Sequence, residues 1–254
     1  MGKAKWFVLL AFIGVLLASA PAFGDVMFSD GTFNLANYNQ TVAGLSGPAI
    51  SIAASQCSSC GNPGDALQVM TAFGDTSTTE GSLDQGYINN TFSYDPLTQG
   101  PIVAITASVD KNLDISIQGS SFTFGNSFHP VIEQDGNFYV ATIAGPLNDG
   151  GVTGFLTLSQ SGLVASDFTE YDFATGSFLS GNPNFSGDPI LLGLAQFSSL
   201  KVTGEPSVQI TATYDNLSFD LQTVPEPSSV CLFAGLVLIL GVSFVIQRRR
   251  QGAS

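Results

Sequence analysis

Residues 129–143 read HPVIEQDGNFYVATI, two short apolar segments joined by Asp135 and Gly136. An Asp-Gly pair readily adopts the positive φ angles of a tight turn, so this stretch predicts a β-hairpin. Residues 208–221 (VQITATYDNLSFDL) alternate apolar and polar side chains, as in a strand with one buried face. Both stretches favour a β-rich fold.

The rest of the segment 25–223 follows the same pattern. Short β-branched or alternating runs occur at 100–109, 113–118 and 152–158. Clusters of turn residues at 147–151 and 180–189 separate such runs. Only residues 66–72 and 191–200 allow a helical interpretation, and the second also fits a pair of strands. We therefore predict an all-β fold, a single β-sandwich or jelly roll over residues 25–223.

The charge of this body is strongly negative. Residues 25–223 contain 19 acidic side chains and two lysines, Lys111 and Lys201, a net charge of −17, and no arginine. Recognition of nucleic acid needs a basic face for the phosphates. The composition therefore excludes a nucleic-acid-binding function and favours solubility.

The first 24 residues have the organisation of a secretory signal peptide. Two lysines precede an apolar run from Trp6 to Leu17, and small residues follow it. Cleavage is expected after Ala20, Ala22 or Gly24. The alternative is a permanent N-terminal membrane anchor, but either interpretation places the body outside the cytoplasm.

The C-terminal region predicts a transmembrane helix. Residues 229–246 are apolar enough to span a bilayer, and a helix of that length extends about 27 Å. Arg248, Arg249 and Arg250 follow it, and the positive-inside rule keeps such a cluster in the cytoplasm. Pro225 and Pro227 cannot continue the helix backwards, so an extended, accessible segment is expected just outside the membrane.

The order of these elements resembles a known sorting signal. Val224, Pro225, Glu226 and Pro227, followed by an apolar span and a terminal arginine cluster, are similar to the PEP-CTERM signal, here residues 224–250. In that family an integral-membrane exosortase recognises the signal and processes the precursor at the triplet. The resemblance implies a single-pass precursor whose mature form resides in the cell envelope or extracellular matrix. An ordinary single-pass protein with a Pro-rich stalk is the alternative.

The body also resembles secreted sandwich domains. The segments FSDGTF (28–33), 129–143 and TYDNLSF (213–219) are similar to concanavalin-A-like or laminin-G-like domains, and the last also to galactose-binding-like jelly rolls. These resemblances imply a sandwich in which the N-terminal and C-terminal strands lie together. They concern the fold alone and do not imply an activity.

Two cysteines form the most distinctive local motif. Cys57 and Cys60 enclose two serines. Because exported proteins reside in oxidising compartments, where cysteines form disulfides, a local disulfide is the favoured interpretation. A zinc site would need two further ligands, but His129 is the only histidine and Cys231 lies in the predicted membrane span. A redox-active pair is the remaining alternative.

Two kinds of ligand-binding residue are candidates. Calcium prefers oxygen ligands, and Asp25 or Asp30 together with Asp215 could supply them if the end strands meet. An acidic, solubilising surface is the competing interpretation. Sugars stack on aromatic rings beside polar groups, and three tyrosines adjoin Asn or Asp and are expected to be exposed: Tyr87, Tyr94 and Tyr171.

Catalytic residues are not evident. Ser127, His129 and Asp135 lack the elbow motif of serine hydrolases. Asp135 is needed for the hairpin turn, which also argues against Glu133 and Asp135 as the carboxylate pair of a glycosidase. We predict that the chain is not an enzyme. The expected function is that of an exported, non-catalytic exopolysaccharide-binding protein, with exosortase as its processing partner. The alternatives are a structural matrix protein without a specific ligand and a polysaccharide hydrolase.

Overall fold

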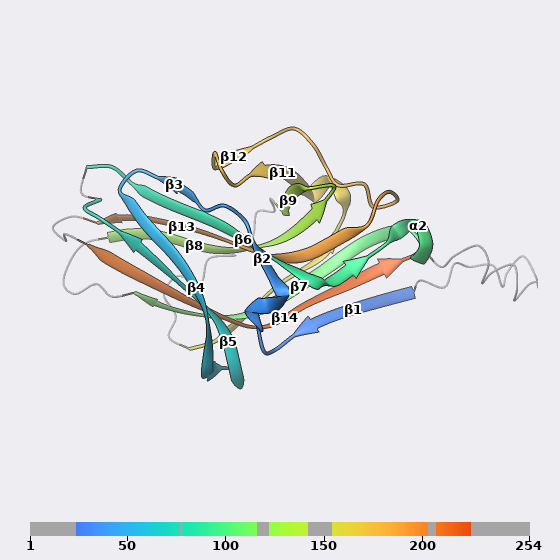
Figure 1. Cartoon of the computed structure of the whole chain (residues 1–254), viewed down its shortest axis with the longest axis horizontal. Helices are drawn as coiled ribbons and strands as arrows, with labels where there is room; N and C mark the ends of the chain where they lie inside the picture. Colours follow the sequence, from blue (N-terminus) through green and yellow to red (C-terminus); the bar gives the residue numbers. More distant parts are fainter. Residues whose placement is uncertain (1–23, 77, 116–121, 142–153, 203–206, 225–254) are drawn as a thin grey trace, which may run out of the picture.

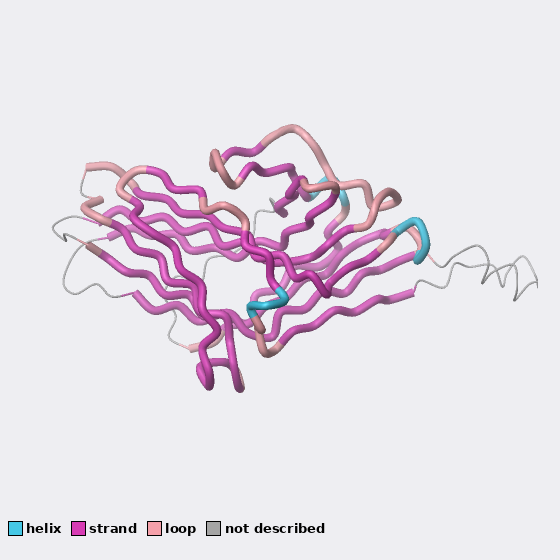
Figure 2. Tube along the Cα trace, in the orientation of Figure 1, coloured by secondary structure: helices cyan, strands magenta, loops and turns pink. Residues whose placement is uncertain are grey.

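The computed structural model describes residues 24–76, 78–115, 122–141, 154–202 and 207–224. Within these residues the chain forms two antiparallel sheets, and helical structure is limited to short turns, as Figure 2 shows. The turns are η1 (Leu35–Asn37), α2 (Pro96–Gln99) and η2 (Ala165–Asp167). The prediction of a two-sheet β-sandwich body is therefore confirmed.

The first sheet has six described strands in the order β10-β7-β14-β5-β4, and β1 pairs with β14 beside β5 (Figure 1). Its strands are β1 (Gly24–Asp30), β4 (Ala49–Gly61), β5 (Gly64–Phe73), β7 (Ile102–Ile115), β10 (Leu156–Leu163) and β14 (Val208–Thr223). Strand β14 is its centre, because β7 pairs with it along one edge, and β5 and then β1 pair with it along the other.

The second sheet has eight described strands in the order β12-β11-β9-β8-β13-β6-β2, and β3 pairs with β6. Its strands are β2 (Tyr38–Gln40), β3 (Gly44–Ser46), β6 (Gly81–Tyr94), β8 (Phe122–Gln134), β9 (Asn137–Ala141), β11 (Phe168–Asp172), β12 (Ser177–Phe178) and β13 (Ile190–Val202). The long strands β6, β8 and β13 form its middle.

The predicted hairpin at 129–143 is confirmed. Strands β8 and β9 pair from Val131↔Val140 to Gln134↔Asn137, and the turn has φ +54° at Asp135 and φ +78° at Gly136. Two positive φ angles are the requirement of a tight hairpin turn, and glycine meets it without steric cost. The two segments with a helical alternative, 66–72 and 191–200, are both strands, in β5 and β13.

The main core lies between the sheets and takes residues from both. The alternation on β14 decides which face is buried: Ile210, Tyr214 and Phe219 are at most 1% exposed, whereas Gln209 and Gln222 face solvent. The register shifts between Asp215 and Ser218, so the alternation restarts and the apolar residues remain on the inner face.

A second, smaller apolar cluster covers the outer face of the eight-stranded sheet. Its members are Ile88, Val131, Val140, Tyr171, Phe173 and Ala195. On β8, Val131 belongs to this cluster, whereas the adjacent Ile132 belongs to the main core. Because neighbouring residues of a strand point to opposite faces, this part of the sheet is buried on both sides.

Candidate functional site

A groove of about 360 Å³ lies on the outer face of the eight-stranded sheet. Strands β3, β6, β8 and β13 contribute to it, and so does the turn that joins β11 to β12. Its lining includes the polar or aromatic residues Ser82, Asp84, Ser127, Tyr171, Thr175, Phe197 and Ser199. We call this feature the outer groove.

The outer groove exists because one edge of the sheet curls over its own outer face. Strands β11 and β12 lie above β6, β8 and β13 in Figure 1, although they are hydrogen-bonded into the same sheet through β9. An aromatic contact holds the curl: the ring centroid of Phe197 on β13 is 4.9 Å from that of Tyr171 on β11, and 4.5 Å from that of His129 on the neighbouring β8. Phe197 therefore forms an aromatic part of the lining, held between two rings.

A glycine lets the opposite edge of the sheet reach the curled edge. A Cβ atom on Gly44 of β3 would lie 2.6 Å from the Asp84 carboxylate and 2.7 Å from the carbonyl oxygen of Phe173. Neither distance is compatible with a real side chain, so only glycine fits between these groups. The close approach brings β3, β6 and the end of β11 together around Asp84.

Asp84 and Tyr171 are the central polar pair of the groove. The Tyr171 hydroxyl donates to Asp84 Oδ2 over 2.5 Å, and Asp84 is only 7% exposed. Burial raises the pKa of the Asp84 carboxyl, and the hydrogen bond from Tyr171 partly offsets this. The pKa of Tyr171 is raised well above its ordinary value, first by burial and then by its bond to Asp84.

A serine–histidine pair lies on the same face of β8. His129 Nδ1 is 2.9 Å from the carbonyl oxygen of Ala141, which can only accept, so the proton resides on Nδ1. The bare Nε2 then accepts from the Ser127 hydroxyl over 2.8 Å. Burial lowers the pKa of His129, nearby Lys111 lowers it further, and the bond to Ala141 opposes both.

This pair differs from a hydrolase triad in its third member. The group that orients His129 is a backbone carbonyl, and Asp135 lies six residues away in the β8–β9 turn. Asp84, the buried acid on this face, bonds to Tyr171 instead. The arrangement fixes the orientation of the Ser127 hydroxyl and gives the imidazole no carboxylate partner.

The rim of the groove is held by Asp172. Its Oδ1 accepts from the Ala174 amide over 2.9 Å and its Oδ2 from the Thr175 hydroxyl over 2.8 Å. These hydrogen bonds, first that from Thr175, lower the pKa of Asp172. The charged carboxylate thus stabilises the tight turn between β11 and β12, which places Thr175 in the lining.

The prediction that three tyrosines are exposed is wrong. Tyr87 and Tyr94 are 0% exposed in the main core, where their hydroxyls donate to Gln85 Oε1 and to the Gly100 carbonyl. Tyr171 is 5% exposed, but it does line the outer groove. All three belong to strand faces that are covered, and a nearby Asn or Asp is no sign of exposure, because Asn89 beside Tyr87 is itself only 1% exposed.

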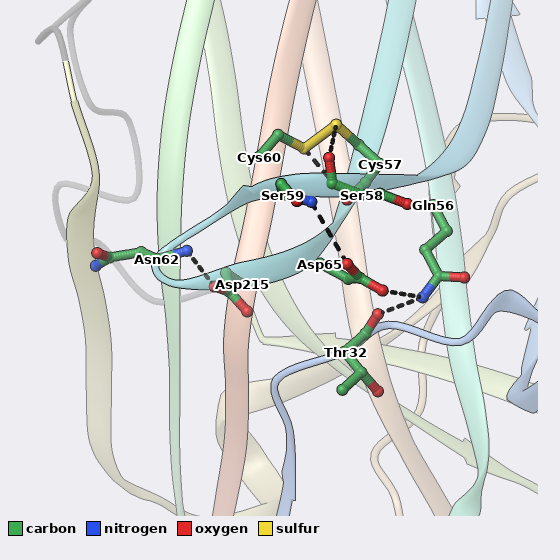
Figure 3. Close-up of a disulfide and its surroundings, with 9 residues drawn as sticks. All are labelled: Thr32, Gln56, Cys57, Ser58, Ser59, Cys60, Asn62, Asp65 and Asp215. Carbon is green, nitrogen blue, oxygen red and sulfur yellow. Dashed lines mark hydrogen bonds between the residues drawn. A yellow bond between two sulfur atoms is a disulfide. The ribbon is translucent and has the colours of Figure 1, made fainter.

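The two cysteines are paired in a disulfide at the tip of the β4–β5 hairpin, with Cα atoms 5.8 Å apart (Figure 3). Beneath it, the buried carboxylate of Asp215 accepts from the backbone amide of Asn62, which links the tip to β14. Gln56 adds a second link, because its side-chain amide donates to the Thr32 carbonyl over 2.8 Å. The disulfide-bearing tip is thus fastened to β14 and to the loop that follows β1.

The N-terminal and C-terminal strands pair as expected, but their register is compatible with only one of the two predicted calcium-ligand pairs. Strand β1 pairs with β14 from Gly24↔Thr223 to Asp30↔Leu217. Asp25 lies opposite Gln222, seven residues and about 20 Å along the strand from Asp215, so grouping Asp25 with Asp215 is wrong.

Asp30 lies nearer to Asp215, but protein donors already surround its carboxylate. The amides of Thr32 and Phe33 and the hydroxyls of Thr32 and Tyr38 donate to it over 2.8–3.0 Å. In the described part of the chain, no three His, Cys, Asp or Glu residues form a group suited to a metal ion. The arrangement shows Asp30 as the anchor of a turn.

The elements predicted at the two ends lie mostly outside the described residues. These are the signal peptide (1–24, except Gly24), Pro225, Glu226 and Pro227, the span 229–246 and Arg248, Arg249 and Arg250. Among the helices that are described, none has the length and apolar character needed to cross a bilayer. Val224 is described, and its amide donates to the Pro101 carbonyl over 3.0 Å.

Comparisons with known proteins give weak likenesses only. No family model matches the chain, and no curated protein matches it. The xylan-binding CBM22-1 domain of Paenibacillus barcinonensis Xyn10C is 13% identical, over 82% of this chain and 99% of that domain, with a TM-score of 0.26. A structure with a xylogluco-oligosaccharide is 11% identical, over 68% of this chain and 36% of that one, with a TM-score of 0.27. The fold assignment rests on this chain's own strand order.

Sequence reasoning missed Asp84 and Phe197, although each carries a signal. Asp84 has the same parity in its strand as Ile88, so a carboxylate and an apolar side chain lie on one face of β6. Phe197 follows a long apolar run in β13 in which both parities are occupied by apolar side chains. Such runs indicate a sheet covered on both faces, and a carboxylate on the second face then needs a buried partner.

Proposed function

We propose that the chain is an exported protein of the cell envelope or extracellular matrix whose body binds polysaccharide, without catalysis, in the outer groove. The observation that carries the proposal is the groove itself. Its volume lies within the range of about 300–1,000 Å³ of small-molecule sites, and it combines an aromatic ring, Phe197, with hydroxyls and one carboxylate, Asp84. Aromatic rings beside oriented polar groups are the usual means of holding a sugar.

The test of binding uses a matched pair of variants of the full-length chain. Ser199→Tyr places a ring in the groove, whereas Thr211→Tyr places one on the outer face of the six-stranded sheet. Both positions are half-buried hydroxyl residues three residues from the end of a long strand. We expect host exopolysaccharide to bind the native chain and Thr211→Tyr alike, and Ser199→Tyr at least about tenfold more weakly. Equal binding by both variants would rule out the groove as the site.

We further propose that an exosortase processes the precursor at Val224, Pro225, Glu226 and Pro227. Support comes from the resemblance of 224–250 to a sorting signal and from the end of the body. Strand β14 ends at Thr223 and Val224 is still hydrogen-bonded to Pro101, so the triplet follows the folded body without a spacer. Replacing residues 225–227 with alanine should leave the full-length form in the inner membrane. Unchanged apparent mass and localisation would instead indicate a simple membrane tail.

A structural matrix protein without a ligand is the alternative function. It predicts that host exopolysaccharide shows no saturable binding to the native chain. A hydrolase would shorten the polymer on incubation, and this activity would depend on Ser127 and His129 or on a carboxylate. Measuring binding and polymer length in the same samples separates the three possibilities.

A further inference from the structure

Hydrogen-bond directions in the outer groove restrict what it can hold. An ionised carboxylate only accepts hydrogen bonds, so the 2.5 Å contact between Tyr171 and Asp84 consumes the phenolic proton. The Tyr171 oxygen is left with lone pairs. Asp84 Oδ1 has no hydrogen bond within the described residues, so it too is available as an acceptor.

Two hydroxyls of the lining also donate their only proton to a neighbouring side chain. Ser127 donates its proton to His129 Nε2, because the carbonyl of Ala141 keeps the other ring nitrogen protonated. Thr175 donates to Asp172 Oδ2 over 2.8 Å. Each hydroxyl has one proton, so both oxygens face a ligand as acceptors. Ser82 and Ser199 also line the groove, and their hydroxyls can rotate to donate or accept.

Cationic side chains do not offset this excess of hydrogen-bond acceptors in the groove. The groove lining contains no lysine or arginine among the residues that the structure describes. Lys111 is 0% exposed and donates to the Asn126 carbonyl over 2.6 Å. Lys201 is exposed on β13, two residues beyond Ser199 and outside the lining.

We infer that the outer groove selects an uncharged, hydroxyl-rich glycan and rejects glycans that carry carboxylate or sulfate groups. This inference rests on the proposed polysaccharide-binding function and names its ligand class. Sugar hydroxyls supply the donors that Asp84, Tyr171, Ser127 and Thr175 require. An acidic sugar would bring a second carboxylate beside Asp84 with no cation in the lining, and like charges in such proximity are strongly disfavoured.

The test compares polymers that share one backbone. Polygalacturonate and its fully methyl-esterified form differ in charge and keep the same ring hydroxyls, and hydroxyethyl cellulose and carboxymethyl cellulose form a second pair. Titrations of the full-length chain are run at low salt and at 0.5 M NaCl, where the Debye length is about 4 Å. We expect the neutral member of a pair to bind at least about tenfold more tightly, and the preference to persist in high salt.

Two variants assign the preference to the groove. Asp84→Asn keeps an acceptor for Tyr171 but removes the charge, so it should weaken neutral binding about tenfold or more and reduce the neutral-to-acidic ratio. Asp114→Asn makes the same charge change at an exposed position of β7 on the other sheet and should alter neither quantity.

The outcomes are distinct. Equal affinity for both members of a pair, or a preference that disappears in high salt, would overturn the inference and leave polysaccharide binding intact. The same ratio in Asp84→Asn as in the native chain would also overturn it. Failure of every polymer to bind would overturn the proposed function, and the inference with it.

Discussion

The two outer faces of the sandwich differ although both belong to long antiparallel strands. The outer face of the six-stranded sheet presents isolated polar residues such as Gln209 and Thr211 on β14 and Asp114 on β7. The outer face of the eight-stranded sheet carries an apolar cluster, a curled edge and the outer groove. One face is an ordinary solvated surface, whereas the other is a second, small interior.

The difference follows from how each strand is patterned. On β14, apolar side chains occupy one parity up to Tyr214 and the other from Leu217 on, and the register shift between these segments keeps them on one face, so the opposite face remains in water. On β9 and β13 both parities carry apolar side chains, and β8 adds Val131 to the second face, so water contact there is unfavourable and the sheet edge folds over it. A polar group on that second face, such as Asp84, must then have a partner.

The largest expected effect tests whether the second face is a true interior. Phe197→Ala removes a ring that contacts His129 and Tyr171, and such truncations cost roughly 3 kcal/mol of unfolding free energy. Thr211→Ala on the other outer face should change it by less than about 0.5 kcal/mol. Urea unfolding of both variants measures the contrast, and similar losses would show that the two faces do not differ.

A second prediction concerns the six-stranded sheet. Replacing Cys57 and Cys60 with serine opens a very short loop, so the expected loss of unfolding free energy is about 1–2 kcal/mol. Because the disulfide lies on the β4–β5 hairpin and the groove on the opposite sheet, glycan affinity should remain unchanged. A calorimetric melt and a binding titration on the same variant check both parts. A loss of glycan affinity would contradict the independence of the two sheets.

His129 should make the second face sensitive to mild acid. Its pKa in the folded protein is lowered below 6.5, so the unfolded chain binds more protons and stability is lost as pH falls through 6.5 towards the folded pKa. Its neighbours on the packed elements are Ser127, Lys111 and the Ala141 carbonyl. Melting curves between pH 5 and pH 8 should show this decline in the native chain and a flatter profile in His129→Gln. Parallel profiles would exclude His129 as the cause.

The smallest change in stability is expected for Asp84→Asn. Unlike the other substitutions, it should stabilise the protein at neutral pH. The pKa of the folded Asp84 carboxyl is raised, so ionising it lowers stability as pH rises above the unfolded value of 3.8. The asparagine variant should therefore melt slightly higher than the native chain at pH 7, and the two should converge below about pH 3.8. A lower melting temperature at pH 7 would mean that the bond from Tyr171 outweighs the cost of burial.

The sequence predicts the elements better than their arrangement. Local chemistry is sufficient for the Asp135-Gly136 turn, the alternating strand at 208–221 and the Cys57–Cys60 pair, because each depends on residues close in the chain. The burial of Tyr87 and Tyr94 depends on which face each sheet turns inward, and the separation of Asp25 from Asp215 depends on strand register. Register and the curl of the sheet are non-local properties.

The position of β14 also has a mechanical consequence. Its last residues pair with β1 on one side and β7 on the other, in register from Leu217 to Thr223 with β1. A pull on the chain at Val224 would act along the strand and load these hydrogen bonds in parallel, so that many must break together before β14 slides. A body tethered through its C-terminal end would therefore resist tension far better than one attached through a strand that can peel from an edge.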